Sequence, residues 1–289
     1  MIDDMISKKG EKKYMERKLF CELGPTAYKI SVFKGIAVRN IKDFLSFQKF
    51  AKSKKTQPLE NIVKSHTSLI VRKLHGVDLT LQKNKETNLR LAAEKINGII
   101  IRPGETFSFW RLVGQPSAKR GYKDGLTISS KSGLGQGVGG GLCQMANMIH
   151  WLVLHSSLET TELHHHSDAL FPDENRRVPF GTGTSVFYKT LDYRFKNTLD
   201  CDYQLLVWLE DGYLCGELRS EKPSEKRYKI YETDNHFRKE GDDYYRISKV
   251  YRTVTDIKTG DKREELLLDN HSKVMYEHEL IPKEQIRDD

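Results

Sequence analysis

The amino-acid sequence predicts an α+β fold, in which helices and an antiparallel sheet occupy different parts of the chain. Three patterns support this class: helical spacing of apolar residues near the N-terminus, mixed helix and strand patterns in the middle, and alternation of aromatic and polar residues near the C-terminus. We therefore divide the chain into a basic, mainly helical region (1–83), a central mixed α/β domain (84–220) and a C-terminal antiparallel β region (221–289).

The N-terminal region is predicted to be helical because its large apolar residues recur every three or four positions. These residues are Ile41, Phe44, Leu45, Phe47 and Phe50. Pro58 interrupts the pattern.

The central domain opens with a helix pattern over residues 88–97, followed by three consecutive isoleucines at 99–101. The isoleucines indicate a short buried strand, which the turn Pro103-Gly104 ends. A second helix is predicted over residues 145–155, which contain no glycine or proline.

The C-terminal region alternates aromatic and polar residues in several runs, as a half-buried strand requires. The apolar positions are Tyr228, Ile230, Tyr231, Tyr244, Tyr245, Ile247 and Val250. A turn at Thr259-Gly260 separates two runs and predicts an antiparallel hairpin or a small sheet.

Bulk composition is that of a soluble protein, with 289 residues of which 37% are apolar and 30% charged. Every apolar stretch is far shorter than the roughly 18–20 residues that span a membrane. Residues 1–20 mix acidic residues with lysines around no apolar centre, so we expect no secretory signal as the sequence stands. We expect a cytoplasmic protein, with peripheral contact to a membrane as an additional possibility.

Positive charge is concentrated at the N-terminus, where residues 1–55 hold 14 Lys and Arg against 6 Asp and Glu (14 − 6 = +8). Such a segment could bind an anionic membrane surface or another anionic polymer, or it could simply be a solvated helical face. Nucleic acid is not expected as a partner, because the sequence has neither zinc-finger spacing nor an aromatic RNA-binding strand.

One of the four cysteines stands out by its surroundings. Cys21, Cys201 and Cys215 are widely separated and form no pattern typical of a disulfide framework or a zinc site. Cys143 instead follows a run with six glycines, Gly133-Leu-Gly-Gln-Gly-Val-Gly-Gly-Gly-Leu-Cys. The run does not match the phosphate-loop signature. We expect a helix to begin near Cys143, which would lower the thiol pKa and offer free backbone N–H groups to an oxyanion.

A histidine cluster, His164-His165-His166, supplies candidate bases for Cys143. His164 and His166 share a face of an extended segment, so either could accept the thiol proton, with His166 preferred. Asp192 is the candidate group that would orient the histidine, in the chain order seen in papain-like cysteine enzymes.

Two other uses of the cluster stay open. The histidines could bind a metal together with Asp168 and Cys143, or they could be hydrogen-bonded at the entrance of a strand. No H-E-x-x-H motif or cysteine pair supports the metal, so we expect neither a metal nor a cofactor.

Further polar residues are candidates for contacts with a substrate. They are Gly139, Gly140, Gly141, Gln144, Glu105, Ser108 and Tyr122.

Several separated motifs resemble the VanW family, in the same order and over residues 84–220. They are the helix at 88–97, Arg102-Pro-Gly-Glu-Thr-Phe-Ser-Phe109, Gly121-Tyr122, Gly139-Gly-Gly-Leu-Cys-Gln144, the histidine cluster and Phe195-Lys196-Asn197. Phe109-Trp110, His150-Trp151 and Phe171-Pro172-Asp173 resemble the shorter proteins encoded in vancomycin-resistance clusters.

The resemblance implies a link to glycopeptide (vancomycin) resistance and to cell-wall metabolism. Some proteins with this domain are connected with L,D-transpeptidation of peptidoglycan through the cysteine that matches Cys143. Our leading hypothesis is therefore a cysteine transpeptidase or amidase that acts on a peptidoglycan precursor or stem peptide. The alternative is a non-catalytic module that binds a cell-wall precursor or a partner protein.

Overall fold

The computed structural model describes residues 23–71, 79–129, 133–165, 168–172, 176–188 and 190–287. The chain forms two compact units, residues 1–45 and residues 46–289. Helix α1 (Pro25–Leu45) is the described element of the first unit. All other described elements belong to the second unit.

A four-stranded sheet in the second unit has the strand order β2-β11-β10-β3, and all three of its pairings are antiparallel. Its strands are β2 (Asn61–Leu69), β3 (Ile99–Ile101), β10 (Tyr203–Glu210) and β11 (Tyr213–Ser220). The hairpin β10–β11 turns at Asp211-Gly212, where both residues have positive φ (47° and 80°). An Asp-Gly pair suits this two-residue turn because both residues tolerate the left-handed region.

Helices α2 (Leu79–Ile96) and α4 (Leu142–Leu154) contact this sheet and each other. In α4, ten of the thirteen residues are buried, which makes it the central helix of the main hydrophobic core. The isoleucines of β3 are fully buried in agreement with the predicted buried strand.

A second four-stranded sheet, with the order β1-β4-β9-β7, carries much of the polar network described below. Its strands are β1 (Lys49–Phe50), β4 (Glu105–Ser108), β7 (Glu159–Glu162) and β9 (Arg194–Lys196). The short helix α3 (Phe109–Val113) follows β4 directly, and Ser108 caps it by accepting a hydrogen bond from the Arg111 backbone N–H. The hairpin β5 (Asp124–Ser129) and β6 (Gly133–Val138) leads into α4.

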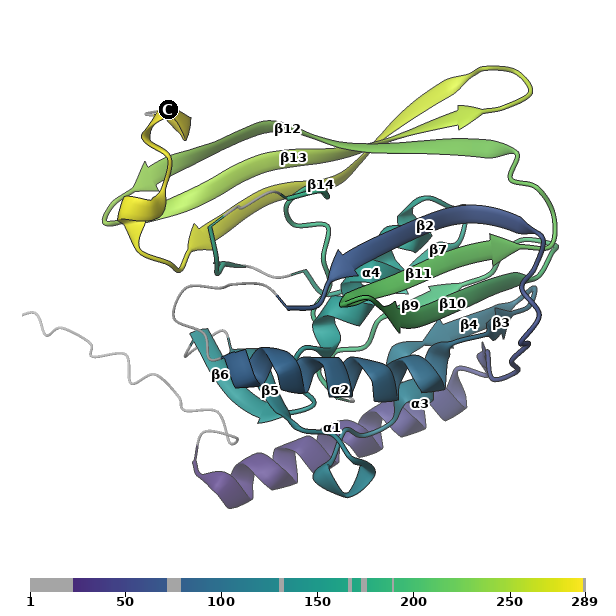
Figure 1. Ribbon diagram of the computed structural model, residues 1–289, viewed down its shortest axis with the longest axis horizontal. Coiled ribbons are helices and arrows are strands. Elements are labelled where there is room, and N and C mark those ends of the chain that lie inside the picture. The colour runs from purple at the N-terminus through teal and green to yellow at the C-terminus, as the bar shows by residue number, and fades with distance from the viewer. Residues whose placement is uncertain are drawn as a thin grey trace, which may run out of the picture. The chain divides into compact units, whose positions relative to one another are not determined.

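Three long antiparallel strands make up most of the C-terminal part: β12 (Lys226–Glu240), β13 (Asp243–Asp256) and β14 (Lys262–Val274). They run side by side as a layer of their own (Figure 1), with β8 (Asp168–Ala169) and β15 (Ile286–Arg287) at its two edges. A small second core around Phe180, Phe237 and Ile281 packs at this sheet.

The mixed helices and sheets place the protein in the α+β class, as the sequence predicts. The region 1–83 departs from the helical expectation in two places. Helix α1 ends at Leu45, so Phe47 (φ 51°) and Phe50, which lies in β1, fall outside the helix that their spacing predicts. Residues 61–69 form strand β2. This strand pairs with β11 over its whole length, so long-range pairing outweighs the local helical pattern. Within the described ranges, no helix combines the length and apolarity that crossing a membrane requires.

Candidate functional site

The glycine turn before α4 is built by close backbone packing. Gly139 and Gly141 have positive φ (82° and 92°), and Gly141 is the N-cap residue of α4. A Cβ atom on Gly140 would lie 2.2 Å from the carbonyl carbon of Gly125. These glycines are therefore needed for the turn itself and for the contact with strand β5, whatever else they contact.

Asn88 of α2 stabilises this turn through hydrogen bonds of its side chain. Its side chain is fully buried and donates to the carbonyls of Lys123 and Gly140, both at 2.9 Å. Its Oδ1 accepts the Lys123 N–H at 2.8 Å. Asn88 thus joins the start of α4 to the segment that precedes β5.

Cys143 is the second residue of α4 and is half-buried. Its Sγ lies 3.7 Å from the carbonyl oxygen of Val186, to which the thiol donates. The N-cap residue Gly141 has no side chain and so provides no side-chain cap hydrogen bond to the N–H groups of the first turn. Burial raises the pKa of the Cys143 thiol, whereas the helix N-terminus led us to expect a lowered one. Desolvation outweighs the backbone hydrogen bonds of Val186 and Cys143, which lower the pKa, so the resting thiol is protonated at neutral pH.

Gln144, the neighbour of Cys143, connects α4 to β2. Its Nε2 donates to Ser68 Oγ at 2.8 Å and to the Leu69 carbonyl at 2.9 Å. Tyr122 is buried, and its hydroxyl has no hydrogen-bond partner among the described residues. Burial raises the pKa of Tyr122 as well.

Glu105 and Ser108, two more predicted substrate contacts, hold local structure in β4. Glu105 accepts the Arg102 backbone N–H at 2.9 Å and closes the turn before the strand. Ser108 is buried and donates to Asp192 Oδ2 at 2.6 Å.

Asp192 is buried at 1% exposure and accepts four hydrogen bonds. Oδ1 accepts the backbone N–H groups of Trp110 (3.0 Å) and Tyr193 (2.9 Å). Oδ2 accepts Ser108 Oγ and, at 2.8 Å, Arg194 Nε. The donors to this carboxylate are thus a serine, an arginine and two backbone amides, and they occupy both oxygens.

His164 contacts a different carboxylate, that of Glu162, which the sequence analysis did not single out. His164 Nε2 lies 3.0 Å from Glu162 Oε1, which also accepts the Asp192 backbone N–H at 2.9 Å. Glu162 Oε2 forms an ion pair with Arg194 at 3.4 Å. The sequence offers one indication of this contact. Glu162 and His164 are two residues apart, and residues i and i+2 of an extended segment share a face.

The structure places the predicted residues in two groups. Cys143 adjoins Gly141 and Gln144 at the start of α4, and Ser108 adjoins Asp192. Within the described part of the chain, Cys143 forms no hydrogen bond with either His164 or Asp192. His166, the preferred base, lies outside the described residues.

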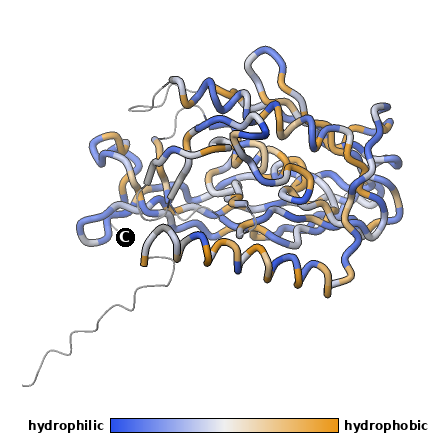
Figure 2. The backbone as a smooth tube through the Cα atoms, turned by 90° about the horizontal axis from the view of Figure 1, so that it is seen from below, coloured by the Kyte–Doolittle hydropathy of each residue, from blue (hydrophilic) through white to orange (hydrophobic). Residues whose placement is uncertain are grey.

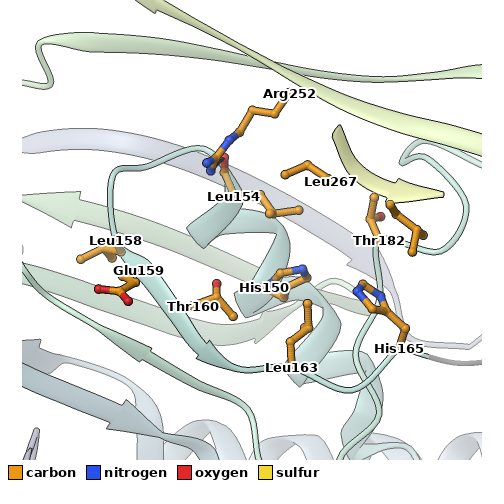
Figure 3. A pocket seen from close by; sticks show the side chains of 11 residues that line it. His150, Leu154, Leu158, Glu159, Thr160, Leu163, His165, Thr182, Arg252 and Leu267 are labelled. Atoms are coloured by element: carbon orange, nitrogen blue, oxygen red, sulfur yellow. Dashed lines mark hydrogen bonds between the residues drawn. The ribbon is translucent and has the colours of Figure 1, made fainter. Parts of the chain in front are cut away.

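A cavity of about 280 Å³ lies farther along α4, between that helix, β7 and the C-terminal sheet. Figure 3 shows His150 and His165 facing each other across it, with Arg252 above. Its remaining lining residues are Leu154, Leu158, Glu159, Thr160, Leu163, Thr182, Leu267 and Leu268. His150 is buried and hydrogen-bonds through Nδ1 to Tyr193 Oη at 3.1 Å. Burial lowers the pKa of His150 to about 3, so its ring is neutral.

Metal binding is one of the two alternatives to a catalytic role for the histidine cluster. Among the described residues, no group of three or more His, Cys, Asp and Glu side chains lies close enough together to hold a metal ion. His165 instead contacts the Gly181 carbonyl through Nδ1 at 3.1 Å.

Comparison with known proteins gives one family. The family model described as VanW like protein matches residues 84–219. The vancomycin B-type resistance protein VanW of Enterococcus faecalis (strain ATCC 700802 / V583) is 36% identical over 202 residues, which cover 70% of this chain and 73% of that protein. The uncharacterized protein YoaR of Bacillus subtilis (strain 168) is 32% identical over 115 residues, or 40% of this chain and 36% of that protein. No solved structure matches this chain significantly. From the extent and identity of the match to the enterococcal protein, the chain belongs to the VanW family.

Proposed function

We propose that this protein is a cysteine-dependent acyl transferase or amidase that acts on peptidoglycan-type peptides, in the manner of an L,D-transpeptidase. The observation that carries the proposal is the half-buried Cys143 thiol at the N-terminus of α4, where the N-cap residue is a glycine and provides no side-chain cap. The name of the enterococcal relative connects the family with vancomycin resistance. A substrate from the cell wall is part of this proposal.

The proposed reaction has two steps. The sulfur of Cys143 attacks a peptide carbonyl, and the carbonyl oxygen takes negative charge that the backbone N–H groups at the start of α4 stabilise. The C–N bond then breaks, the thiol proton leaves with the amine, and a thioester remains. An acceptor amine attacks the thioester in transpeptidation, whereas water attacks it in hydrolysis, and either step restores the thiol.

The raised pKa of the thiol requires a base that removes the proton as the bond forms. His166 and His164 remain the proposed bases. For His164 the orienting carboxylate is Glu162, at 3.0 Å from Nε2, and Asp192 contributes by holding the segment that carries Arg194. The substrate would have to bring thiol and imidazole together, since the two are not hydrogen-bonded in the described structure.

A non-catalytic binding module is the second candidate, and two observations favour it. Burial raises the pKa of Cys143, and the glycines at 139–141 pack against the protein's own backbone and side chains. In that case the thiol packs against the Val186 segment and does not react.

Thiol alkylation separates the two candidates. The rate of Cys143 modification by iodoacetamide would be followed by peptide mass spectrometry from pH 5 to 10. The measurement would compare the native chain with His164→Ala, His166→Ala and the matched control His165→Ala. If the protein is an enzyme, either His164→Ala or His166→Ala should slow alkylation near neutral pH, whereas His165→Ala should not. If none of the three variants alters the alkylation rate, the thiol has no paired base among these histidines.

Activity would then be measured with stem peptides and an acceptor amine, by mass spectrometry of the products. The proposal predicts a thioester adduct on Cys143 and no product with Cys143→Ser. Binding of the peptide with equal affinity by native chain and Cys143→Ser, without any product from either, would instead support the binding module.

A further inference from the structure

Helix α1 exposes a set of large apolar side chains. Phe33 is 74% exposed, Phe44 79% and Ile41 58%. Such side chains are costly to leave in water along one helix, because burial of their apolar surface is favourable. The other exposed apolar residues of the helix are Ile30, Val38 and Leu45.

These side chains fall on one face of the helix. At 3.6 residues per turn, Phe33, Phe44, Ile30 and Ile41 lie within an arc of roughly 80°, and Leu45 and Val38 widen it to roughly 140°. Figure 2 shows apolar residues recurring along α1. A stripe of this width normally faces a hydrophobic environment.

The charges of α1 are almost all positive. Lys29 and Lys42 border the apolar arc on its two sides, and Lys34 lies within it. Arg39 adds a fourth positive charge, while Asp43 is the only acidic residue of the helix. Residues 1–55 as a whole hold a net charge of +8.

We propose that α1 binds in the plane of an anionic membrane surface, with Phe33, Ile41 and Phe44 at the boundary between head groups and acyl chains. The lysines would then contact lipid phosphates. Lys34 favours a membrane over a second protein copy, because a protein interface would bury its ammonium group. At a membrane its aliphatic stem extends along the apolar layer and its charge reaches the head groups. The inference is independent of the proposed reaction of Cys143.

Vesicle sedimentation with the full chain tests this inference. Binding to vesicles of phosphatidylcholine with phosphatidylglycerol would be compared with binding to phosphatidylcholine alone, at low and high salt. The native chain is expected to bind the anionic vesicles, and salt should weaken that binding. Replacing both Phe33 and Phe44 by Gln, which keeps helix propensity, should weaken it by about tenfold or more for each residue.

Two further variants complete the test. Lys29→Gln with Lys42→Gln should weaken binding to anionic vesicles by about fivefold per lysine. Ile257→Gln with Leu266→Gln is the matched control, since these residues are 53% and 52% exposed in the other unit, and it should bind as the native chain does. Unchanged thermal melting would show that each variant is folded.

Three outcomes would overturn the inference. They are no binding of the native chain to anionic vesicles, equal binding by the phenylalanine variant, and a native dimer that the phenylalanine variant converts to monomer without any vesicle binding. The last result would show that a second copy covers α1.

Discussion

Replacing Asp192 by Asn tests whether this residue stabilises the fold or serves the reaction. The carboxylate is 1% exposed and accepts four hydrogen bonds, so its surroundings are organised around an acceptor. In the variant, Oδ1 can still accept the N–H groups of Trp110 and Tyr193. The amide NH₂ that replaces Oδ2 can donate to Ser108 Oγ but opposes the Nε–H of Arg194.

The main loss is therefore the charged hydrogen bond from Arg194. Its side chain is 9% exposed, and its ion pair with Glu162 is longer, at 3.4 Å. A hydrogen bond to a charged group contributes about 1.5–3 kcal/mol, and an unsatisfied buried donor costs a comparable amount. We expect Asp192→Asn to lower the free energy of unfolding by about 2–4 kcal/mol. At roughly 2–4 °C per kcal/mol, Tm should fall by about 4–16 °C.

Urea unfolding followed by circular dichroism measures this change, and Ser108→Ala is the matched comparison. Ser108→Ala removes one neutral donor to Asp192 and the N-cap of α3, and should cost about 1–2 kcal/mol. The double variant should cost less than the sum of the two, because both changes act on Oδ2. If Asp192→Asn unfolds within about 0.5 kcal/mol of the native chain while peptide turnover is lost, the structural role argued here is wrong and Asp192 acts in the reaction.

Three further predictions follow from single residues. Gly140→Ala should lower the free energy of unfolding by about 3 kcal/mol or more, because its Cβ would overlap the backbone of strand β5. Gly104→Ala is the control: a Cβ there has nothing within 4 Å, so the change should cost only about 1 kcal/mol. Urea unfolding measures both. Alkylation of Cys143 should be half-maximal above the pH of about 8.5 that is typical of a free thiol, because burial raises its pKa; a midpoint near 7 would contradict this effect of burial. His150, with its pKa lowered to about 3 by burial, stays neutral in the folded state while the unfolded chain binds a proton below about pH 6.5. The contribution of His150 to stability should therefore fall by about 2 kcal/mol between neutral pH and pH 5, a loss that His150→Gln should remove.

Local patterns predicted local elements well. The uninterrupted apolar run after Cys143 indicated a helix, and α4 begins at Leu142. Aromatic alternation and the Thr259-Gly260 turn indicated the C-terminal hairpin, and β13 and β14 pair antiparallel across it. In both cases the residues that determine the structure are neighbours in the sequence.

Long-range contacts were harder to predict. Ser108 and Asp192 are 84 residues apart, and nothing in either segment indicates that one donates to the other. Strand β2 was missed because its stability comes from pairing with β11, about 150 residues later. The pKa of Cys143 was expected with the wrong sign because the helix position is visible in the sequence, whereas the burial that raises the pKa is a property of the whole core.

Helix α4 carries both the Cys143 thiol and a residue of the cavity, His150, so it connects the two places that could act on a ligand. Cys143 lies in its first turn, and His150 lines the cavity two turns later, on a helix that is buried along most of its length. Because a buried helix moves as one body, a ligand in the cavity and a reaction at Cys143 would act on the same rigid element. A change of Cys143 alkylation upon His150→Gln, with native stability at neutral pH, would therefore show that the cavity and the thiol are coupled. An unchanged rate would separate them and leave the cavity as a site of its own.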